Sequence, residues 1–190
     1  MVVVRSYARA MRELARVDEV VQHLLQSWNT VPAFIRDEHF VVLASNAMAR
    51  SLTHSFERGV NLALFAFLDP ETELTVVNFD EVSAQVAGHL RDSLLRPDAE
   101  LRELVSVLMD HSSQFSEVWA ADLRAAQSSA EIEIDHPQVG RMSLTYQQLA
   151  LPGNDLQVLV VWRAGPDSAS QSAFARLTML VADASAPPSP

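Results

Sequence analysis

The sequence contains no cysteine, and its five glycines are widely spaced along 190 residues. Without cysteine the protein can form no disulfide, no thiolate metal site and no cysteine nucleophile. Isolated glycines provide no glycine-rich loop for a phosphate group. The sequence also lacks His-Glu-x-x-His, a histidine pair at metal-ligand spacing and a Gly-x-Ser-x-Gly elbow. We therefore expect no metal and no cofactor, and no motif identifies an enzyme.

Positive charge is scarce, because 14 basic residues stand against 24 acidic ones and the formal net charge is −10. A body of this charge repels a phosphate backbone, so we expect no direct binding to nucleic acid. No apolar run approaches the roughly 18 residues of a membrane span. The valines at positions 2–4 are too few for a signal peptide, and arginines follow them instead of preceding them. We expect a cytoplasmic protein that does not bind membranes.

Residues 6–28 have the pattern of an amphipathic helix. Leu14, Val17, Val21, Leu24 and Trp28 recur at steps of three and four, which places them on one apolar stripe. Arginines at positions 5, 9, 12 and 16 form a second stripe. This second stripe is either a solvated helix face or a face for docking or dimerisation. A partner helix or a second copy of the chain would pack on the apolar stripe of the same helix. A remnant of a linker to an upstream domain is a further interpretation.

The remaining chain alternates between strand and helix signals. Apolar runs at 33–36 and 40–44 flank a polar turn, as in a β-hairpin. Helices are predicted at residues 46–52, 61–68 and 78–95 and after positions 98 and 112. The last third alternates apolar and polar residues with period two, which predicts strands near residues 130–135, 142–147 and 156–162, before a final helix from residue 168.

This order predicts a mixed α/β (α+β) fold. Two strands, a helical insertion and three antiparallel strands are the sequence of elements in a PAS-like five-stranded sheet. The insertion lies between strands 2 and 3, and further helices flank the sheet at both ends. We assign residues 1–30 to the N-terminal helix, 31–183 to the PAS-like domain, and 184–190 to a disordered tail rich in proline and serine.

A family resemblance extends over residues 11–181. The residues that carry it are Pro32, Ala33 and Phe34; Leu43 and Asn46; Asn61; Phe67, Leu68, Asp69 and Pro70; Val86, Ala87, Leu90 and Arg91; Phe115 and Trp119; His136, Pro137, Val139 and Gly140; Leu144 and Tyr146; and Leu151, Pro152 and Gly153. In their order and spacing the chain resembles the ligand-binding domain of MmyB-like transcription regulators, which are common in actinobacteria. The resemblance implies a PAS-like fold and a sensor for a small apolar molecule, fatty-acid-like in character.

The sequence also departs from this family. Members usually carry a helix-turn-helix domain upstream, and the chain has only about ten residues before the resemblance begins. Leu64 and Glu73 stand where the family usually has arginine, Asn78 and Phe79 replace an Asp-Trp pair, and Asp122 falls near a family histidine. Together with the acidic body, these changes give no basis for carrying DNA regulation over to this chain.

The candidate ligand-binding residues are mostly large and apolar, and they come from both helices and strands. They are Phe34, Leu64, Phe67, Phe79, Val86, Leu90, Phe115, Trp119, Met142, Leu144, Tyr146 and Trp162. Their alternative role is simply to form the core. Tyr146 would be a polar handle in a cavity. A ligand with a carboxylate head would need an arginine, because a buried charge must be paired, and Arg141 and Arg163 are the candidates.

The favoured function is a stand-alone PAS-like domain that binds a hydrophobic small molecule, fatty-acid-like or polyketide-like, in a sensory role. In one alternative, the cavity serves as a cofactor-free cyclase or isomerase of a biosynthetic pathway, with Tyr146, Asn78 and Asp122 as catalytic candidates. In another, the chain is a protein-interaction or dimerisation module. The sequence does not decide whether the protein is an enzyme.

Overall fold

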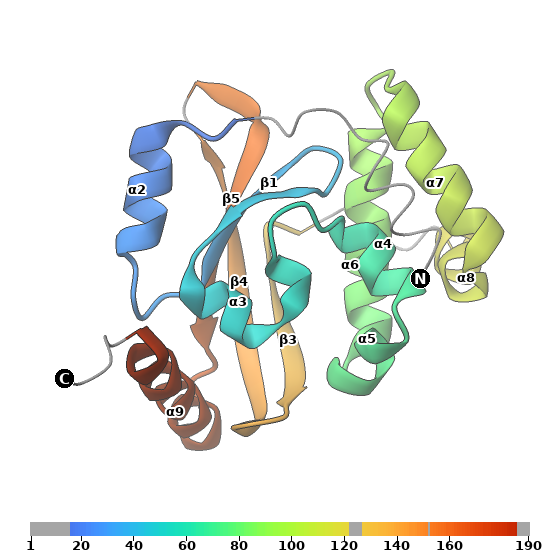
Figure 1. Cartoon of the computed structure of the whole chain (residues 1–190). Helices are drawn as coiled ribbons and strands as arrows, with labels where there is room; N and C mark the ends of the chain where they lie inside the picture. Colours follow the sequence, from blue (N-terminus) through green and yellow to red (C-terminus); the bar gives the residue numbers. More distant parts are fainter. Residues whose placement is uncertain (1–15, 122–126, 152, 186–190) are drawn as a thin grey trace.

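The computed structural model describes residues 16–121, 127–151 and 153–185, and Figure 1 shows their arrangement as a sheet with helices packed against it. Five strands and several helices alternate along the chain. In chain order the elements are α2 (Glu19–Ser27), β1 (Ala33–Asp37), β2 (Val42–Ser45), α3 (Ala47–Leu52), the 3-10 helix η1 (His54–Phe56), α4 (Leu62–Leu68), α5 (Pro70–Thr75), α6 (Phe79–Ser93), α7 (Ala99–His111), α8 (Ser113–Ala120), β3 (Ser129–His136), β4 (Gly140–Leu151), β5 (Asn154–Ala164) and α9 (Ser168–Ser185).

The strands form one antiparallel sheet in the order β2-β1-β5-β4-β3. The two strands before the helical insertion thus pair with the last strand of the chain, which lies at the centre of the sheet. Phe34 is opposite Val160 in the β1–β5 pair, and Tyr146 is opposite Trp162 in the β4–β5 pair. The predicted five-stranded PAS-like sheet, with its insertion between the second and third strands, is confirmed.

The two faces of the sheet have different coverings. Leu25 of α2 packs with Ala33, Ile35 and Leu43 in a cluster on one face. On the other face, aromatic and aliphatic side chains of the central strands pack with α3, η1 and α9. Because successive side chains of a strand point to opposite faces, β1 contributes to both clusters. The sheet therefore separates two hydrophobic clusters. One lies under α2, on what we call the back face, and the other lies against α3, η1 and α9, on the front face.

The N-terminal helix is shorter than the sequence pattern predicts. Residues 16–18 are not helical, and α2 begins at Glu19. Asp18 caps this start, since its carboxylate accepts hydrogen bonds from the backbone N–H groups of Val20 and Val21. The prediction of one continuous helix over residues 6–28 is thus wrong at its centre, and residues 1–15 lie outside the described part of the chain.

The helical insertion begins its helices where the sequence predicts. The side chains of Asn46, Asn61, Asp98 and Ser112 each accept a hydrogen bond from a backbone N–H in the first turn that follows. Two short elements were not predicted, η1 and α5. Proline ends the preceding helix but also fits the first turn of a new one, and α5 begins at Pro70.

The insertion has a hydrophobic core of its own, separate from that of the sheet. Phe67 packs edge-to-face on both Phe79 and Phe115, with ring centroids 6.3 and 4.9 Å apart. Leu64 and Leu90 are fully buried in the same cluster. In Figure 1 these helices gather to one side of the sheet. Together with the clusters on the two faces of the sheet, the domain thus has three hydrophobic clusters.

The last helix runs slightly beyond the expected domain boundary. Helix α9 ends at Ser185, so Ala184 and Ser185 belong to the helix and not to a tail. Residues 186–190 lie outside the described part of the chain. None of the described helices is long and apolar enough to cross a membrane.

Asn46 holds the N-terminal segment to the hairpin. Its side chain is 1% exposed. The amide oxygen accepts hydrogen bonds from the backbone N–H groups of Ala33 and Ala49, at 3.1 and 2.9 Å. The amide nitrogen donates to the carbonyl oxygens of Trp28 and Val31, at 3.0 and 2.7 Å. One side chain therefore satisfies four backbone groups, two of them buried and two partly buried.

Replacing Asn46 should destabilise the fold more than loss of an ordinary helix cap. We expect Asn46→Ala to lower the free energy of unfolding by about 3 kcal/mol, because it removes a cap and leaves backbone groups unpaired. Asn46→Asp keeps the two accepted bonds but sets a carboxylate against two carbonyl oxygens, so it should still cost about 2 kcal/mol. Chemical denaturation measures both values. Full stability of Asn46→Asp would mean that capping alone matters.

Candidate functional site

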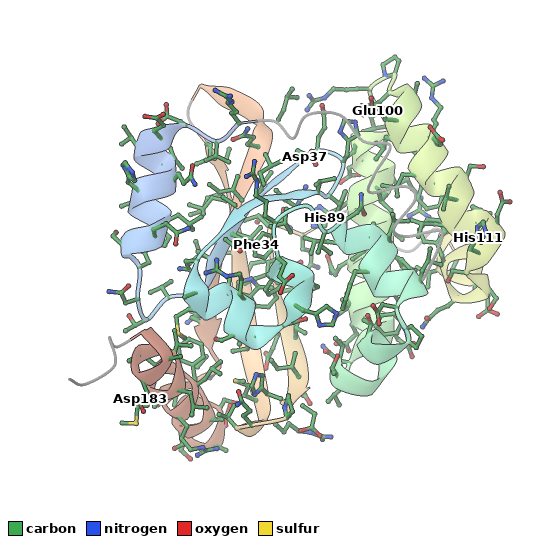
Figure 2. All side chains as sticks on the ribbon, viewed as in Figure 1. Phe34, Asp37, His89, Glu100, His111 and Asp183 are labelled. Carbon is green, nitrogen blue, oxygen red and sulfur yellow. The ribbon has the colours of Figure 1, made fainter. Side chains whose placement is uncertain are left out.

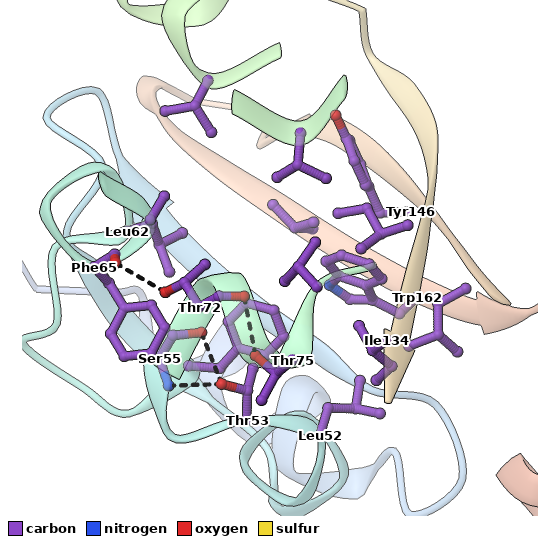
Figure 3. Close-up of a pocket in the computed structure, with 18 of the residues that line it drawn as sticks. Leu52, Thr53, Ser55, Leu62, Phe65, Thr72, Thr75, Ile134, Tyr146 and Trp162 are labelled. Carbon is purple, nitrogen blue, oxygen red and sulfur yellow. Dashed lines mark hydrogen bonds between the residues drawn. The ribbon is translucent and has the colours of Figure 1, made fainter. Parts of the chain in front are cut away.

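A pocket of about 890 Å³ lies between the front face of the sheet and the helical insertion. Its walls come from β1, β3, β4 and β5 on one side and from α3, η1, α4, α5 and α6 on the other. Ligand sites for drug-sized molecules have volumes of about 300–1,000 Å³. The pocket is thus large enough for a small organic ligand (Figure 3).

The sheet wall is aromatic at its centre. Trp162 lies between Phe56 and Tyr146, with ring centroids 5.5 and 5.2 Å away, and Phe34 stacks on Phe56 at 4.5 Å. Leu144 of β4 adds to this surface. The indole N–H of Trp162 has no hydrogen-bond partner among the described residues, and the residue is buried, with only 7% of its surface exposed. An unpaired buried donor of this kind costs about 1–3 kcal/mol.

The helical wall mixes apolar side chains with hydroxyl groups. Leu62 and Phe65 supply apolar surface (Figure 3). The hydroxyl of Thr72 donates to the carbonyl oxygen of Phe65 at 3.0 Å, and that of Thr53 donates to the hydroxyl of Ser55 at 3.2 Å. These hydroxyls are therefore already bonded within the protein, and the lining of the pocket as a whole is more apolar than polar.

One end of the pocket carries a connected polar group, which we call the Arg36 cluster and define as Arg36, Gln148, His89 and Tyr146. The guanidinium of Arg36 donates to Oε1 of Gln148 at 3.0 Å. The amide nitrogen of Gln148 lies 2.9 Å from Nε2 of His89, which is also 3.0 Å from the carbonyl oxygen of Gln127. Figure 2 shows His89 between the sheet and the helices. The cluster thus joins two sheet strands to helix α6.

Burial controls the protonation of this cluster. It lowers the pKa of Arg36 to about 10, so the guanidinium stays charged at neutral pH. Burial, reinforced by the charge of Arg36, lowers the pKa of His89 to about 4, so the imidazole is neutral. Burial raises the pKa of Tyr146, whose hydroxyl therefore keeps its proton. At pH 7 the cluster contains one cation among neutral hydrogen-bonding groups.

Five of the twelve predicted ligand-binding residues line the pocket: Phe34, Val86, Leu144, Tyr146 and Trp162. The other seven do not. Leu64, Phe67, Phe79, Leu90, Phe115 and Trp119 belong to the core of the helical insertion, and Met142 packs in the core between the sheet and α9. The sequence pattern identified all of these side chains as apolar and inward-facing, but it did not distinguish those facing the pocket from those facing another helix.

Of the three catalytic candidates the structure describes two, Tyr146 and Asn78, and it does not place both in the pocket. Tyr146 lines the pocket, whereas Asn78 binds the edge strand outside the lining: its side chain accepts from the N–H of Glu133 and donates to the carbonyl oxygen of Glu131. Asp122 lies outside the described residues. The two described candidates, Tyr146 and Asn78, therefore form no arrangement of nucleophile, acid and base with each other.

The expected arginines are also elsewhere. Arg141 and Arg163 do not line the pocket, whereas Arg36 and Arg50 do. Arg36 was missed, although it stands two residues after Phe34 and period-two alternation puts both side chains on one face. The signal was available, but a charged residue in a strand is usually taken as solvent-facing.

One group of potential metal ligands is found among the described residues. Single ligand atoms of Glu38, His39 and Asp98 lie within 4.8 Å of one another. Nε2 of His39 and a carboxylate oxygen of Asp98 are 2.8 Å apart and bond to each other, and none of the three residues lines the pocket. We assign no metal to this group.

Comparison with known protein families matches residues 17–177 to the MmyB-like transcription regulator ligand binding domain. The match covers most of the 190-residue chain. The chain belongs to this family. It is therefore a ligand-binding domain of the kind found in these regulators, as the sequence resemblance predicted. A search among curated proteins gives no significant match.

Family membership makes two of the departures in sequence more informative. Leu64, one of the departures from the family pattern expected from the sequence, is fully buried in the core of the helical insertion. Phe79 is also buried there, against Phe67. In this member of the family these two positions therefore contribute packing, and the buried charge near the ligand space comes from Arg36.

The depressed pKa of His89 makes stability depend on pH. An unfolded histidine titrates near 6.5 and the folded one near 4, so between these values the unfolded chain binds more protons. Stability should fall as the pH drops through this window, by up to about 3 kcal/mol from His89. His89→Gln should remove this part of the loss in urea titrations at pH 7 and pH 4. His111→Gln, at an exposed site, should not. Equal losses in all three proteins would contradict the assignment.

Proposed function

We propose that this domain binds a hydrophobic small molecule in the pocket between sheet and insertion, and that occupancy serves a sensory, regulatory role. The observation that carries the proposal is the pocket of about 890 Å³ between two separately packed cores. Its aromatic sheet wall and largely bonded hydroxyls favour burial of an apolar body. Removing apolar surface from water contributes about 25 cal/mol per Å², which suits a ligand held mainly by its hydrocarbon part.

The regulatory half of the proposal is supported by family membership and by the way the insertion is attached. The backbone N–H of Val77 donates to the carbonyl oxygen of Glu133 at 2.8 Å, and the side chain of Asn78 binds the same strand. Helix α6 starts directly after this junction and lines the pocket with Val82 and Val86. A ligand that pressed on α6 would act on its anchorage to β3, which offers a route from occupancy to a change in the outer surface.

Ile132 offers a direct test of the pocket. It lines the wall on β3 and is partly buried. We expect Ile132→Trp to fill part of the volume and to weaken binding of a medium-chain probe, 1-dodecanol, at least about ten-fold in calorimetric titration, because a blocked cavity removes apolar contacts. Leu149→Trp is the matched control, since Leu149 is exposed and does not line the pocket. Absence of binding to the unchanged protein would refute the proposed function.

The enzymatic alternative has weaker support. Of its three candidates, Tyr146 lines the pocket, Asn78 is engaged with β3, and Asp122 lies outside the described residues. Neutral His89 lies in the same pocket, but its Nε2 faces Gln148 and the carbonyl oxygen of Gln127. A binding role therefore needs fewer assumptions than catalysis. The net charge of −10 likewise favours action through a partner over direct binding to DNA.

Helix α2 provides a specific observation for a role in dimerisation. Val20 is 76% exposed and Leu24 is 51% exposed, whereas Leu25 of the same helix is buried against the sheet. If a second copy of the chain packs there, light scattering should give a dimer, and the double change Val20→Asp with Leu24→Asp should give a monomer, because charges cannot be buried unpaired. A monomeric unchanged protein would argue against this role, and it would leave the pocket proposal untouched.

A further inference from the structure

The described chain begins beside the tip of the β1–β2 hairpin. The carbonyl oxygen of Arg16 accepts a hydrogen bond from Nε2 of Gln157 at 3.1 Å. In the sheet, Gln157 is paired with Asp37, the last residue of β1. Residues 1–15, which we call the N-terminal segment, therefore join the described chain where the hairpin turns toward helices α6 and α7 (Figure 1). The family match begins at residue 17, so this segment is not part of it.

A second pocket, of about 150 Å³, lies at the same place. Leu156 and Val158, the neighbours of Gln157 in β5, line it from the sheet, and Ser93 and Arg96 line it from the end of α6. Its remaining lining residues are Arg36 and Glu38. A cavity of about this volume can hold a benzene-sized group, so the second pocket has room for one large side chain.

Three carboxylates gather around one histidine next to this pocket. Nε2 of His39 lies 2.8 Å from a carboxylate oxygen of Asp98 and 4.0 Å from one of Glu100. A carboxylate oxygen of Glu38 is within 4.8 Å of ligand atoms of both His39 and Asp98. We call these four residues the His39 cluster. Among the described residues, Arg96 forms no ion pair with it. The cluster thus presents negative charge between the hairpin tip and α7.

The N-terminal segment has the complementary composition. It contains three arginines and one glutamate, a net charge of +2, which leaves −12 on residues 16–190. Its apolar residues include Tyr7, Met11 and Leu14, between arginines at positions 5, 9 and 12. A guanidinium forms strong, charge-assisted hydrogen bonds to a carboxylate. The segment therefore offers arginines for the His39 cluster and an apolar side chain for the second pocket.

From this arrangement we propose that the N-terminal segment docks on the chain's own surface, over the His39 cluster and the second pocket. Arg9 and Arg12 would face the carboxylates, and Met11 would enter the pocket. Met11 is five residues from Arg16, a reach of roughly 17 Å. Because the segment is covalently attached, its effective concentration at this surface is in the millimolar range, so weak contacts suffice. Docked there, it connects the sheet to the helical insertion. The proposal does not depend on what the larger pocket binds.

The acidic residues of β3 are a competing destination on the back face of the sheet. They are already interleaved with arginines, however. Asp135 is directly opposite Arg141, and Glu131 is opposite Thr145, which is itself opposite Arg163. Residues directly opposite each other in a sheet share a face. A basic segment would therefore meet positive charge there, which favours the His39 cluster.

The protein has no cysteine, so a pair of introduced cysteines is unique and can locate the segment. The test pair is Met11→Cys with Leu95→Cys, because Leu95 is 83% exposed between the two α6-side residues of the second pocket. The control pair is Met11→Cys with Leu149→Cys. Leu149 is 45% exposed on the back face, opposite a residue two positions from Gln157, so the segment can also reach it.

The full chain is oxidised with glutathione disulfide at pH 7.5, and each rate is divided by the reactivity of the matching single-cysteine protein at position 95 or 149. The test pair should form an intrachain disulfide at least about ten-fold faster than the control pair, since docking raises the local thiol concentration. In 0.5 M NaCl the difference should shrink, because the Debye length falls to roughly 4 Å.

Charge reversal tests the arginine contacts. In the test pair, Glu38→Arg should slow the cross-link about two- to five-fold, the range expected for an exposed ion pair, and adding Arg12→Glu should restore the rate. Glu57→Arg makes the same charge change at an exposed site outside the cluster and should have no effect.

Equal normalised rates for the two pairs would overturn the proposal. A dimeric product from the test pair would overturn it too, because the segment of a second copy would then occupy the surface. If Glu38→Arg and Glu57→Arg act alike while both proteins keep the circular dichroism of the unchanged chain, the assigned arginine contacts are wrong. None of these measurements involves a ligand, so their failure leaves the proposed function untouched.

Discussion

Alternation along the central strands is the constraint on which the rest of this structure depends. In β1, Ala33 and Ile35 face helix α2, while Phe34 and Arg36 face the pocket. Because the period of a strand is two, the same four residues must serve a dry core on one side and a ligand space on the other. A shift of register by one residue would exchange these faces and place the cation in the α2 core. Asn46 opposes such a shift by fixing both ends of the hairpin to the N-terminal segment.

The elements of the fold were largely predictable because their determinants are local. A capping side chain such as Asn46 or Asp98 marks a helix start through a bond to a residue three positions away, and the β3–β4 hairpin shows its alternation directly in the sequence. The beginning of α5 was not predicted, because a proline such as Pro70 can both end one helix and start another. The non-helical residues 16–18 before α2 were not predicted, because the apolar pattern of residues 14–28 continues across them.

The site was less predictable because it depends on which inward-facing side chains meet. Phe67 and Phe115 have the same helical spacing and apolar character as Val86, yet they pack on each other while Val86 borders the pocket. Periodicity identifies an inward face but not the object it faces, which requires the crossing of helices that are distant in sequence. Arg36 was overlooked for a related reason. The sequence analysis placed it in the run 33–36 without considering it as a site residue, and only the sheet order, which pairs β1 with both β2 and β5, shows that the side chain is enclosed.

The position of Trp162 also equips the molecule with an optical reporter. The chain has three tryptophans, and only this one lines the pocket, in contact with the rings of Phe56 and Tyr146. Trp119 stacks on Phe115 and Arg91 in the helical core, and Trp28 lies at the end of α2. Indole emission depends on the polarity and quenching groups within a few ångströms of the ring. A change in the emission of Trp162 therefore reports whether the pocket is occupied. The other two tryptophans supply an internal reference, so no extrinsic dye is needed.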